Sequence, residues 1–231
     1  EGLRLEETGA IVEAAGFGPG KAFVESARAD RNRRLVQDLD PQAPDLEGYL
    51  FPDTYFFARG TPPDRIVEEM VGRFRREMTS ERTARLKELG LSVRQAITLA
   101  SLVEEEAVAD EERARIAGVF HNRLRKQMLL QCDPTVVYAL QRDNRYRGEI
   151  HSSDLSYESP YNTYLHPGLP PGPICSPGAR SIEAALHPAL TGDLYFVVGE
   201  PGRHRFSSNL EDHEEAVRRY RRDTALSNRR R

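Results

Sequence analysis

Apolar residues recur every three or four positions along most of this chain, and no other feature of the sequence constrains the fold as strongly. The spacing predicts amphipathic helices that bury one side, as in the segment 61–78 with its double proline. One pair of short segments, 193–200 and 204–209, instead predicts two strands joined as a hairpin across Pro-Gly-Arg. We therefore expect an α+β fold that is mostly helical and carries a small β-hairpin.

Capping residues and glycines indicate where several of these helices begin and end. Ser92 is a suitable N-cap and Gly90 a suitable terminator, and Asp110 and Asp133 are placed to begin two further helices. The expected helices cover 3–17, 21–36, 61–78, 81–90, a stretch from 93 past 98, 111–128, 135–141, 181–189 and 210–225.

Two stretches depart from the helical spacing. The block at 49–57 is aromatic and strand-like, although Pro52 interrupts it. Residues 157–180 are rich in proline and glycine, which predicts a long loop.

The composition is that of a soluble globular piece of protein. Of 231 residues, 39% are hydrophobic, which is enough for a substantial core. The 33 basic residues are offset by 36 acidic ones, so the charge balance gives no indication of nucleic-acid binding. The apolar stretches fall far short of the roughly 18 residues that a membrane span needs. The chain also lacks an initial methionine and a signal peptide, so we expect it to be cut from a longer protein.

Three consecutive glutamates interrupt the helix that carries Leu99 and Leu102. At about 100° per residue, and with Leu99 at zero, Glu106 lies near ~340° and points to the same side as both leucines. On the same reckoning Glu105 lies on the polar side of the helix, and Glu104 at the far edge of a broad apolar arc. Glu106 is therefore expected to face the protein interior.

An inward carboxyl has two physical explanations. Burial without a partner disfavours the charged form and raises the pKa, which suits a general acid that works near neutral pH. Alternatively, an arginine such as Arg113 or Arg123 neutralises the carboxylate in a structural ion pair. Helical geometry alone does not separate the two.

Several long blocks of the sequence carry a resemblance to a known family. They include ITLASLVEEEAVADEER (97–113, continuing to 140), SPYNTYLHPGLPPGPICSPG (159–178, continuing to 189) and LYFVVGEPGRHRFSSN (194–209). In this order they resemble the endolytic murein transglycosylases of the YceG-like family. LEGYLFPDTYFF (46–57) resembles another block of that family, and EGLRLEE (1–7) resembles the segment that follows its small LysM-like region.

This resemblance implies a division of the chain. Residues 1–90 would form a helical accessory region with an aromatic strand-like block, beginning at the end of the LysM-like region. Residues 91–231 would form the catalytic domain, with a mostly helical, lysozyme-like fold.

The resemblance also implies an activity. Members of the family cleave the β-1,4 bond between N-acetylmuramic acid and N-acetylglucosamine in peptidoglycan without water, and leave a 1,6-anhydro end. The family motif reads ASLVEEEA here, so the catalytic acid maps to Glu106, with Glu104 as the second candidate and as a substrate contact. One acid can suffice because the sugar's own C6 hydroxyl attacks, whereas hydrolases need a second carboxylate.

Five further residues are candidates for contacts to the glycan. Gln131 offers an amide, and Asp133 is either a substrate contact or a helix cap. Tyr161 and Asn162 offer a stacking ring and an amide for the N-acetyl group, or else serve the packing of their own loop. Ser176 either binds substrate or caps the following turn.

Cys132 and Cys175 lie in two of these blocks and form either a disulfide or two buried thiols. The spacing of the histidines, cysteines and acids suggests no metal site, and we expect no cofactor.

The resemblance implies glycan strands as substrate and peptidoglycan synthases as further partners. It also implies one N-terminal membrane helix, absent from this chain, with the catalytic domain outside the cytoplasmic membrane. Two rival functions are a hydrolytic muramidase and a non-catalytic, glycan-binding scaffold of wall synthesis.

Overall fold

In the computed structural model, which describes residues 1–199 and 202–228, helices surround a central helix and accompany one two-stranded antiparallel sheet. The expected α+β class is confirmed. The elements are α1 (Leu5–Ala14), α2 (Gly20–Arg28), α3 (Asp30–Arg33), η1 (Arg34–Val36), α4 (Pro63–Glu77), α5 (Ser80–Leu89), α6 (Val93–Glu106), η2 (Asp110–Glu112), α7 (Arg113–Arg125), α8 (Asp133–Arg142), η3 (Ser152–Ser156), α9 (Ala179–Leu186), β1 (Tyr195–Val198), β2 (His204–Ser207) and α10 (Leu210–Asn228). Within the described ranges, no helix has the length and apolar character of a membrane span.

Two of the predicted helix boundaries follow from local chemistry. The Ser92 hydroxyl accepts a hydrogen bond from the backbone N–H of Gln95, and the Gln95 side chain accepts one from the backbone N–H of Ser92. This reciprocal capping starts α6. Gly90 ends α5 with a φ of 67°, a left-handed conformation that glycine adopts without strain.

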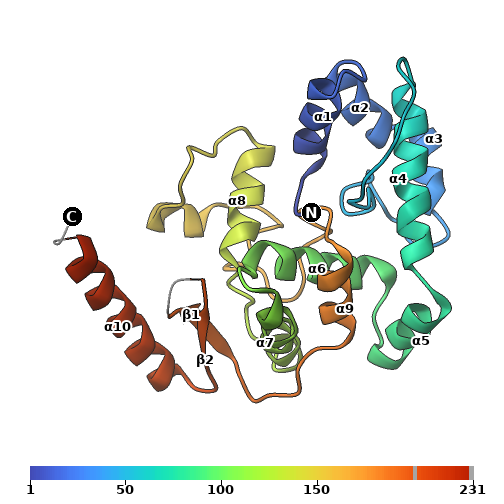
Figure 1. Cartoon of the computed structure of the whole chain (residues 1–231). Helices are drawn as coiled ribbons and strands as arrows, with labels where there is room; N and C mark the ends of the chain where they lie inside the picture. Colours follow the sequence, from blue (N-terminus) through green and yellow to red (C-terminus); the bar gives the residue numbers. More distant parts are fainter. Residues whose placement is uncertain (200–201, 229–231) are drawn as a thin grey trace.

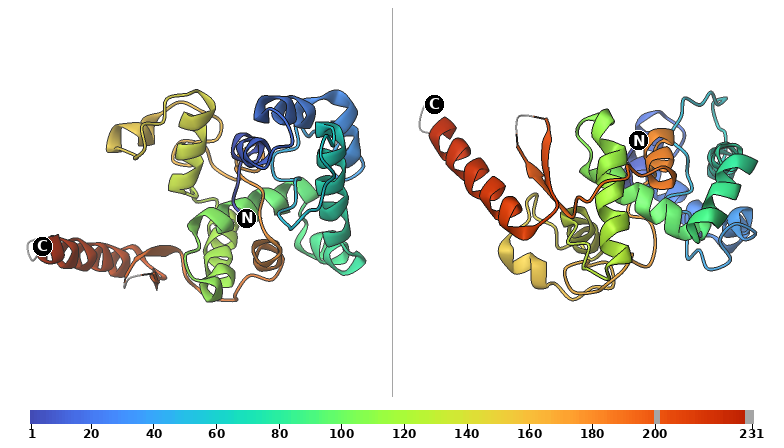
Figure 2. Two further views of the ribbon diagram at one scale, coloured as in Figure 1. Left: turned by 45° about the horizontal axis from the view of Figure 1, so that its top comes forward. Right: turned by 90° about the horizontal axis from the view of Figure 1, so that it is seen from below.

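Helix α6 runs through the middle of the molecule (Figure 1). It packs against α7, α8 and α9, while α1, α2 and α4 form a group on one side. The hairpin of β1 and β2 and the long helix α10 lie on the other side, and α10 extends away from the rest in both views of Figure 2. The predicted hairpin is confirmed, with Tyr195 opposite Ser207 and Val198 opposite His204.

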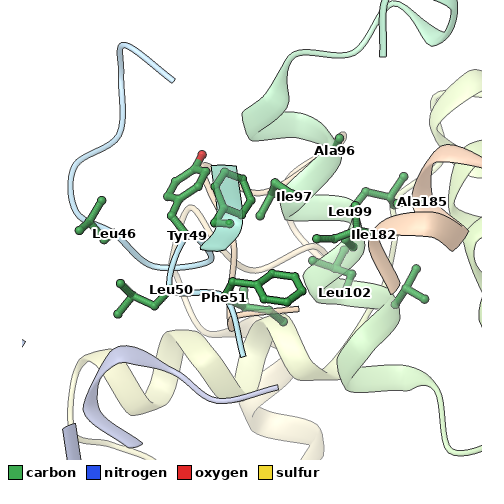
Figure 3. Close-up of a cluster of buried hydrophobic side chains, with 14 of the residues drawn as sticks. Leu46, Tyr49, Leu50, Phe51, Ala96, Ile97, Leu99, Leu102, Ile182 and Ala185 are labelled. Atoms are coloured by element: carbon green, nitrogen blue, oxygen red, sulfur yellow. The ribbon is translucent and has the colours of Figure 1, made fainter. Parts of the chain in front are cut away.

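The hydrophobic core is continuous across position 90. Tyr49, Leu50 and Phe51 are almost fully buried and belong to the same cluster as the buried face of α6 and the apolar side of α9 (Figure 3). The aromatic block therefore packs directly on the helix that carries the glutamates. The division into 1–90 and 91–231 remains a prediction about folding units.

The predicted strand at 49–57 is wrong. The segment is extended, but no strand of the described residues pairs with it, and its Phe51 N–H donates to the carbonyl of Met70 in α4. Aromatic residues favour strands only where a pleated neighbour is available. Here the rings of Tyr49 and Phe51 fill the core instead, whereas Phe56 is exposed.

Three predicted helix boundaries also need correction. The segment 21–36 breaks at Ala29, which is extended, into α2, α3 and η1. Asp110 begins the short 3₁₀ turn η2 rather than capping α7, and its side chain contacts Arg113 and Arg180. Helix α8 has Cys132 as its N-cap residue, so Asp133 is the first helical residue and its side chain is free for another partner.

Candidate active site

The three glutamates at the end of α6 meet different surroundings. Glu104 is paired with Arg113 of α7 at 3.2 Å and accepts a hydrogen bond of 2.9 Å from the N–H of Gly178, at the start of α9. Its side chain is only 7% exposed. Glu104 therefore joins α6, α7 and α9, and the ion pair that the sequence allowed for an inward glutamate forms here rather than at Glu106.

Glu106 lines a cavity of about 400 Å³ between the end of α6, the start of α8 and the hairpin with α10. Gln131 and Asp133, two of the predicted glycan contacts, line the same cavity. Within the part of the chain that the structure describes, no Lys, Arg or His nitrogen lies within 4 Å of the Glu106 carboxyl. Glu106 is thus a half-buried acid that faces open space.

The surroundings raise the pKa of Glu106 to about 7. Burial is the largest cause, because it disfavours the charged carboxylate, and the negative charges of Asp133 and Glu105 act in the same direction. A hydrogen bond from the Cys132 thiol and the more distant charge of Arg123 lower the pKa and partly oppose this. The carboxyl can therefore hold and release a proton near neutral pH.

Glu105 points to a separate, smaller cavity that Leu3 and Tyr138 also line. Burial is the main cause that raises its pKa, and a hydrogen bond with the thiol of Cys175 lowers it. The polar side of α6 is covered at Ser101, which accepts a hydrogen bond from the N–H of Ile174, whereas Glu105 at the end of the helix keeps contact with solvent. The sequence did not indicate that the loop 157–180 would cover this side.

Gln131 has a strained backbone at the edge of the Glu106 cavity. Its φ of 48° lies in the left-handed region, which residues other than glycine rarely adopt. Its N–H donates to the carbonyl of Thr163, and Arg123 donates to its side-chain oxygen at 3.4 Å. Strain of this kind is concentrated at functional sites. The contact to Arg123 leaves the NH₂ group of the Gln131 amide as a donor for a ligand.

A model of the YceG-like family matches residues 1–219 of this chain. The chain belongs to the YceG-like family. A protein of Bacillus subtilis named endolytic murein transglycosylase is 42% identical over 178 residues, which are 76% of this chain and 48% of that protein. One of the same name from Streptococcus pneumoniae is 37% identical over 74% of this chain and 32% of its own length. This chain thus spans about a third to about a half of the length of these curated relatives.

A crystal structure of a YceG-like protein from Listeria monocytogenes has the same fold. It covers 93% of this chain and 73% of its own, with a TM-score of 0.83 and 33% sequence identity. The helical arrangement described above is therefore the YceG-like fold.

In this YceG-like chain, Asp133 is held by a residue that the sequence analysis missed. The hydroxyl of Tyr164 donates to the Asp133 carboxylate at 2.5 Å, and both residues line the Glu106 cavity. Tyr164 ends the block SPYNTY, so its closeness in sequence to Tyr161 and Asn162 could have indicated that it belongs to the site. Asp133 serves this contact instead of the helix-capping role that the sequence allowed.

The other predicted contacts lie outside this cavity. Asn162 is fully buried and donates to the carbonyls of Leu155 and Tyr157, so its amide serves its own loop. Tyr161 packs on Tyr138 at 4.8 Å between ring centroids. These positions match the alternative in which both residues stabilise the loop.

Ser176 is buried and pairs through its backbone with Leu3 near the N-terminus. It borders a different groove, formed by α1 and the aromatic block. Cys132 and Cys175 are both buried free thiols, one beside Glu106 and the other beside Glu105. Among the described residues, no group of three or more His, Cys, Asp or Glu side chains could hold a metal ion.

The far wall of the cavity comes from the hairpin and α10, which sequence reasoning did not assign to the site. Arg123 donates to the carbonyl of Leu194 and so fixes the start of β1 beside α7. The Glu112 carboxylate accepts from both the backbone N–H and the ring Nδ1 of His204, at 3.0 and 2.8 Å. These long-range contacts bring residues 71 and 92 positions apart into one site, which a single sequence does not reveal.

Proposed function

We propose that this chain is the catalytic part of an endolytic murein transglycosylase. The reaction would cleave the β-1,4 bond between N-acetylmuramic acid and N-acetylglucosamine within peptidoglycan strands and leave 1,6-anhydro ends. The observation that carries the proposal is the carboxyl of Glu106, which lies in a cavity without a cationic partner among the described residues and has its pKa raised to about 7. The names of the curated relatives support the same substrate.

In the first step, protonated Glu106 would give its proton to the glycosidic oxygen as the bond to C1 of the muramic acid breaks. A carboxyl with a pKa near the working pH is protonated often enough for this role and still acidic enough to release its proton. The N-acetyl group of the muramic acid would stabilise the positive charge that develops at C1.

In the second step, the C6 hydroxyl of the same sugar would attack C1 and return its proton to the Glu106 carboxylate. The acid is then regenerated and no water is consumed. Hydrolases need a second carboxylate to supply a nucleophile or to activate water. Asp133 shares the cavity but is hydrogen-bonded to Tyr164, which favours a role in positioning over one in activating water.

The test compares the wild-type chain with Glu106→Gln on purified sacculi and on uncrosslinked glycan. Glu106→Gln keeps the size of the side chain but holds no transferable proton, so we expect activity to fall by about three orders of magnitude or more. Glu105→Gln is the matched control, because Glu105 faces another cavity, and it should change activity less than threefold.

The mass of the products separates the lytic reaction from its hydrolytic rival. An anhydro end is lighter by one water than the reducing end that a muramidase leaves. Products with reducing ends only would contradict the proposed reaction, and equal activity of the wild type and Glu106→Gln would remove Glu106 from its role. If the wild type and Glu106→Gln both bind glycan and neither cleaves it, the result would favour the rival function of a non-catalytic, glycan-binding scaffold.

We further propose an extracytoplasmic location, with the whole protein anchored by one membrane helix outside this chain. The substrate requires this side of the cytoplasmic membrane. Action on nascent strands would place the enzyme beside peptidoglycan synthases, which are the partners that we propose. Detection of the anhydro ends in newly labelled glycan would test this.

A further inference from the structure

Helix α10 contributes one histidine, His213, to the Glu106 cavity. The imidazole ring of this residue forms no hydrogen bond with the rest of the described protein. His213 lines the cavity together with His204 of β2. Whereas Glu112 holds His204 by two hydrogen bonds, the Nδ1 atom of His213 is buried and has no hydrogen-bond partner among the described residues. A buried polar atom left in this state is uncommon in native proteins and needs an explanation.

The His213 ring is nevertheless held in place by packing against Tyr195. The ring stacks on Tyr195 of β1, with 5.0 Å between ring centroids and planes only 20° apart. On the same tyrosine lies the guanidinium of Arg123, at 5.1 Å from the ring centroid. Tyr195 thus places the imidazole on the cavity wall.

The proton of the imidazole can be assigned from this environment. Burial lowers the pKa of His213 from its usual 6.5, and the positive charge of Arg123 lowers it further, while the charge of Glu214 partly opposes this, so the neutral form of the ring predominates at pH 7. A neutral imidazole has one N–H group. If that proton were on Nδ1, a buried donor would have no acceptor, which is rarer in proteins than an unpaired acceptor. The donor is therefore Nε2.

We propose that His213 contacts the substrate and donates a hydrogen bond from Nε2 to the carbonyl of a sugar N-acetyl group. The inference rests on the proposed function, because an N-acetylated glycan supplies such carbonyls at every sugar. The stacked ring offers a flat apolar surface beside its single donor, which suits an acetamido group. His213 would then select N-acetylated sugars, whereas Glu106 acts on the bond.

The test measures binding in the Glu106→Gln chain, in which nothing is cleaved, with the β-1,4-linked tetramer of N-acetylglucosamine as probe. His213→Phe keeps a ring on Tyr195 but removes the donor, and we expect Kd to rise about tenfold, which corresponds to one hydrogen bond. In His213→Gln the amide nitrogen reaches the place of Nε2, so Kd should stay within about threefold. The shorter His213→Asn should bind as weakly as His213→Phe.

The β-1,4-linked glucose tetramer, which lacks N-acetyl groups, is the matched probe. It should bind with the same weak affinity whether His213 is present or replaced by phenylalanine. Equal affinity of the Glu106→Gln chain and its His213→Phe variant for the N-acetylated tetramer would overturn the inference, as would an equal loss with the glucose tetramer. Thermal melting of each variant verifies that the fold is intact.

This design separates the inference from the proposed function. If the N-acetylated tetramer binds in a manner that depends on His213 but the wild-type chain cleaves no glycan, the inference stands and the lyase activity fails. If the Glu106→Gln chain binds no N-acetylated tetramer at all, both are contradicted.

Discussion

Glu104 and Glu106 lie two positions apart in one helix, yet their neighbours give them opposite roles. Glu104 contacts the guanidinium of Arg113 and the N–H of Gly178, so its charge is compensated and each of its two carboxylate oxygens accepts a hydrogen bond. Glu106 is desolvated beside a thiol and the negative charges of Asp133 and Glu105, so its proton is retained near neutral pH. The glutamate that could transfer a proton is thus the one that has no cationic partner within residues 1–199 and 202–228.

The pH profile should report the raised pKa of Glu106. The acid must start protonated, so kcat/KM should be level below about pH 7 and fall tenfold per pH unit above it. The Cys132 thiol donates to the carboxylate and lowers this pKa. Cys132→Ala should therefore move the alkaline limb upward by roughly one pH unit or less. Initial rates on soluble glycan between pH 5 and 9 would measure this.

Cys175→Ala is the control for that shift, because Cys175 contacts Glu105 and not Glu106. Its alkaline limb should coincide with that of the wild type. A limb near pH 4.5 in the wild type, the usual value for an exposed glutamate, would contradict the assigned environment of Glu106.

Single residues were predictable where helical geometry determines them. The inward direction of Glu106 follows from 3.6 residues per turn. Gln131 and Asp133 were proposed from the family resemblance instead; they line the same cavity, and their contact with glycan remains a prediction. Tyr164 and His213 were missed because their place depends on how a loop and a distant helix pack. No local pattern carries that information.

At the scale of elements, α7 depends on one small residue where another segment crosses it. The chain after α9 passes over α7 so closely that the N–H of Ala189 donates to the carbonyl of Ala114 at 2.8 Å. A Cβ at Gly118 would lie 2.6 Å from the carbonyl oxygen of Ala189. This crossing leads to β1 and so sets the position of the hairpin wall.

Gly118→Ala should therefore destabilise the protein although alanine favours helices. The clash is with backbone, which cannot rotate away, and we expect a loss of about 1–3 kcal/mol in the free energy of unfolding. Gly72→Ala in α4 is the matched control, since its nearest neighbour is the end of the Arg76 side chain at 3.8 Å. It should gain about 0.5–1 kcal/mol from helix propensity. Urea unfolding of the two variants would measure both values, and a gain in each would contradict the close crossing.

The elements themselves were predictable to different extents. Long periodic segments such as α4 and α6, and the two paired strands β1 and β2, follow from local pattern. The block at 49–57 could not be assigned correctly, because its aromatic residues suit a strand and a core equally. Only the tertiary neighbours decide between them.

At the scale of the whole molecule, one buried carboxyl links parts that the sequence assigned to different regions. Glu47 is 5% exposed and accepts a hydrogen bond of 3.1 Å from the N–H of Leu5 at the start of α1. On its other side the hydroxyl of Tyr138 in α8 lies at 3.4 Å. Together with the continuous core, this contact indicates that the N-terminal helices and the part of the chain that carries α8 stabilise each other.

Glu47 should also make the stability of the whole chain depend on pH. Burial is the main cause that raises its pKa from 4.5 to about 8, and the nearby charge of Asp45 adds to it. A carboxyl with a higher pKa in the folded state stabilises the fold fully below pH 4.5, and this stabilisation is lost as the pH rises through about 8. Glu47→Gln keeps the acceptor for Leu5 without the charge, so its free energy of unfolding should fall less between pH 5 and 9, by on the order of a few kcal/mol. Urea titrations at each pH would measure these free energies, and Glu25→Gln, at an exposed position of α2, should follow the wild type. Parallel curves of unfolding free energy against pH for the wild type and Glu47→Gln would show that the Glu47 carboxyl is not held in this buried position.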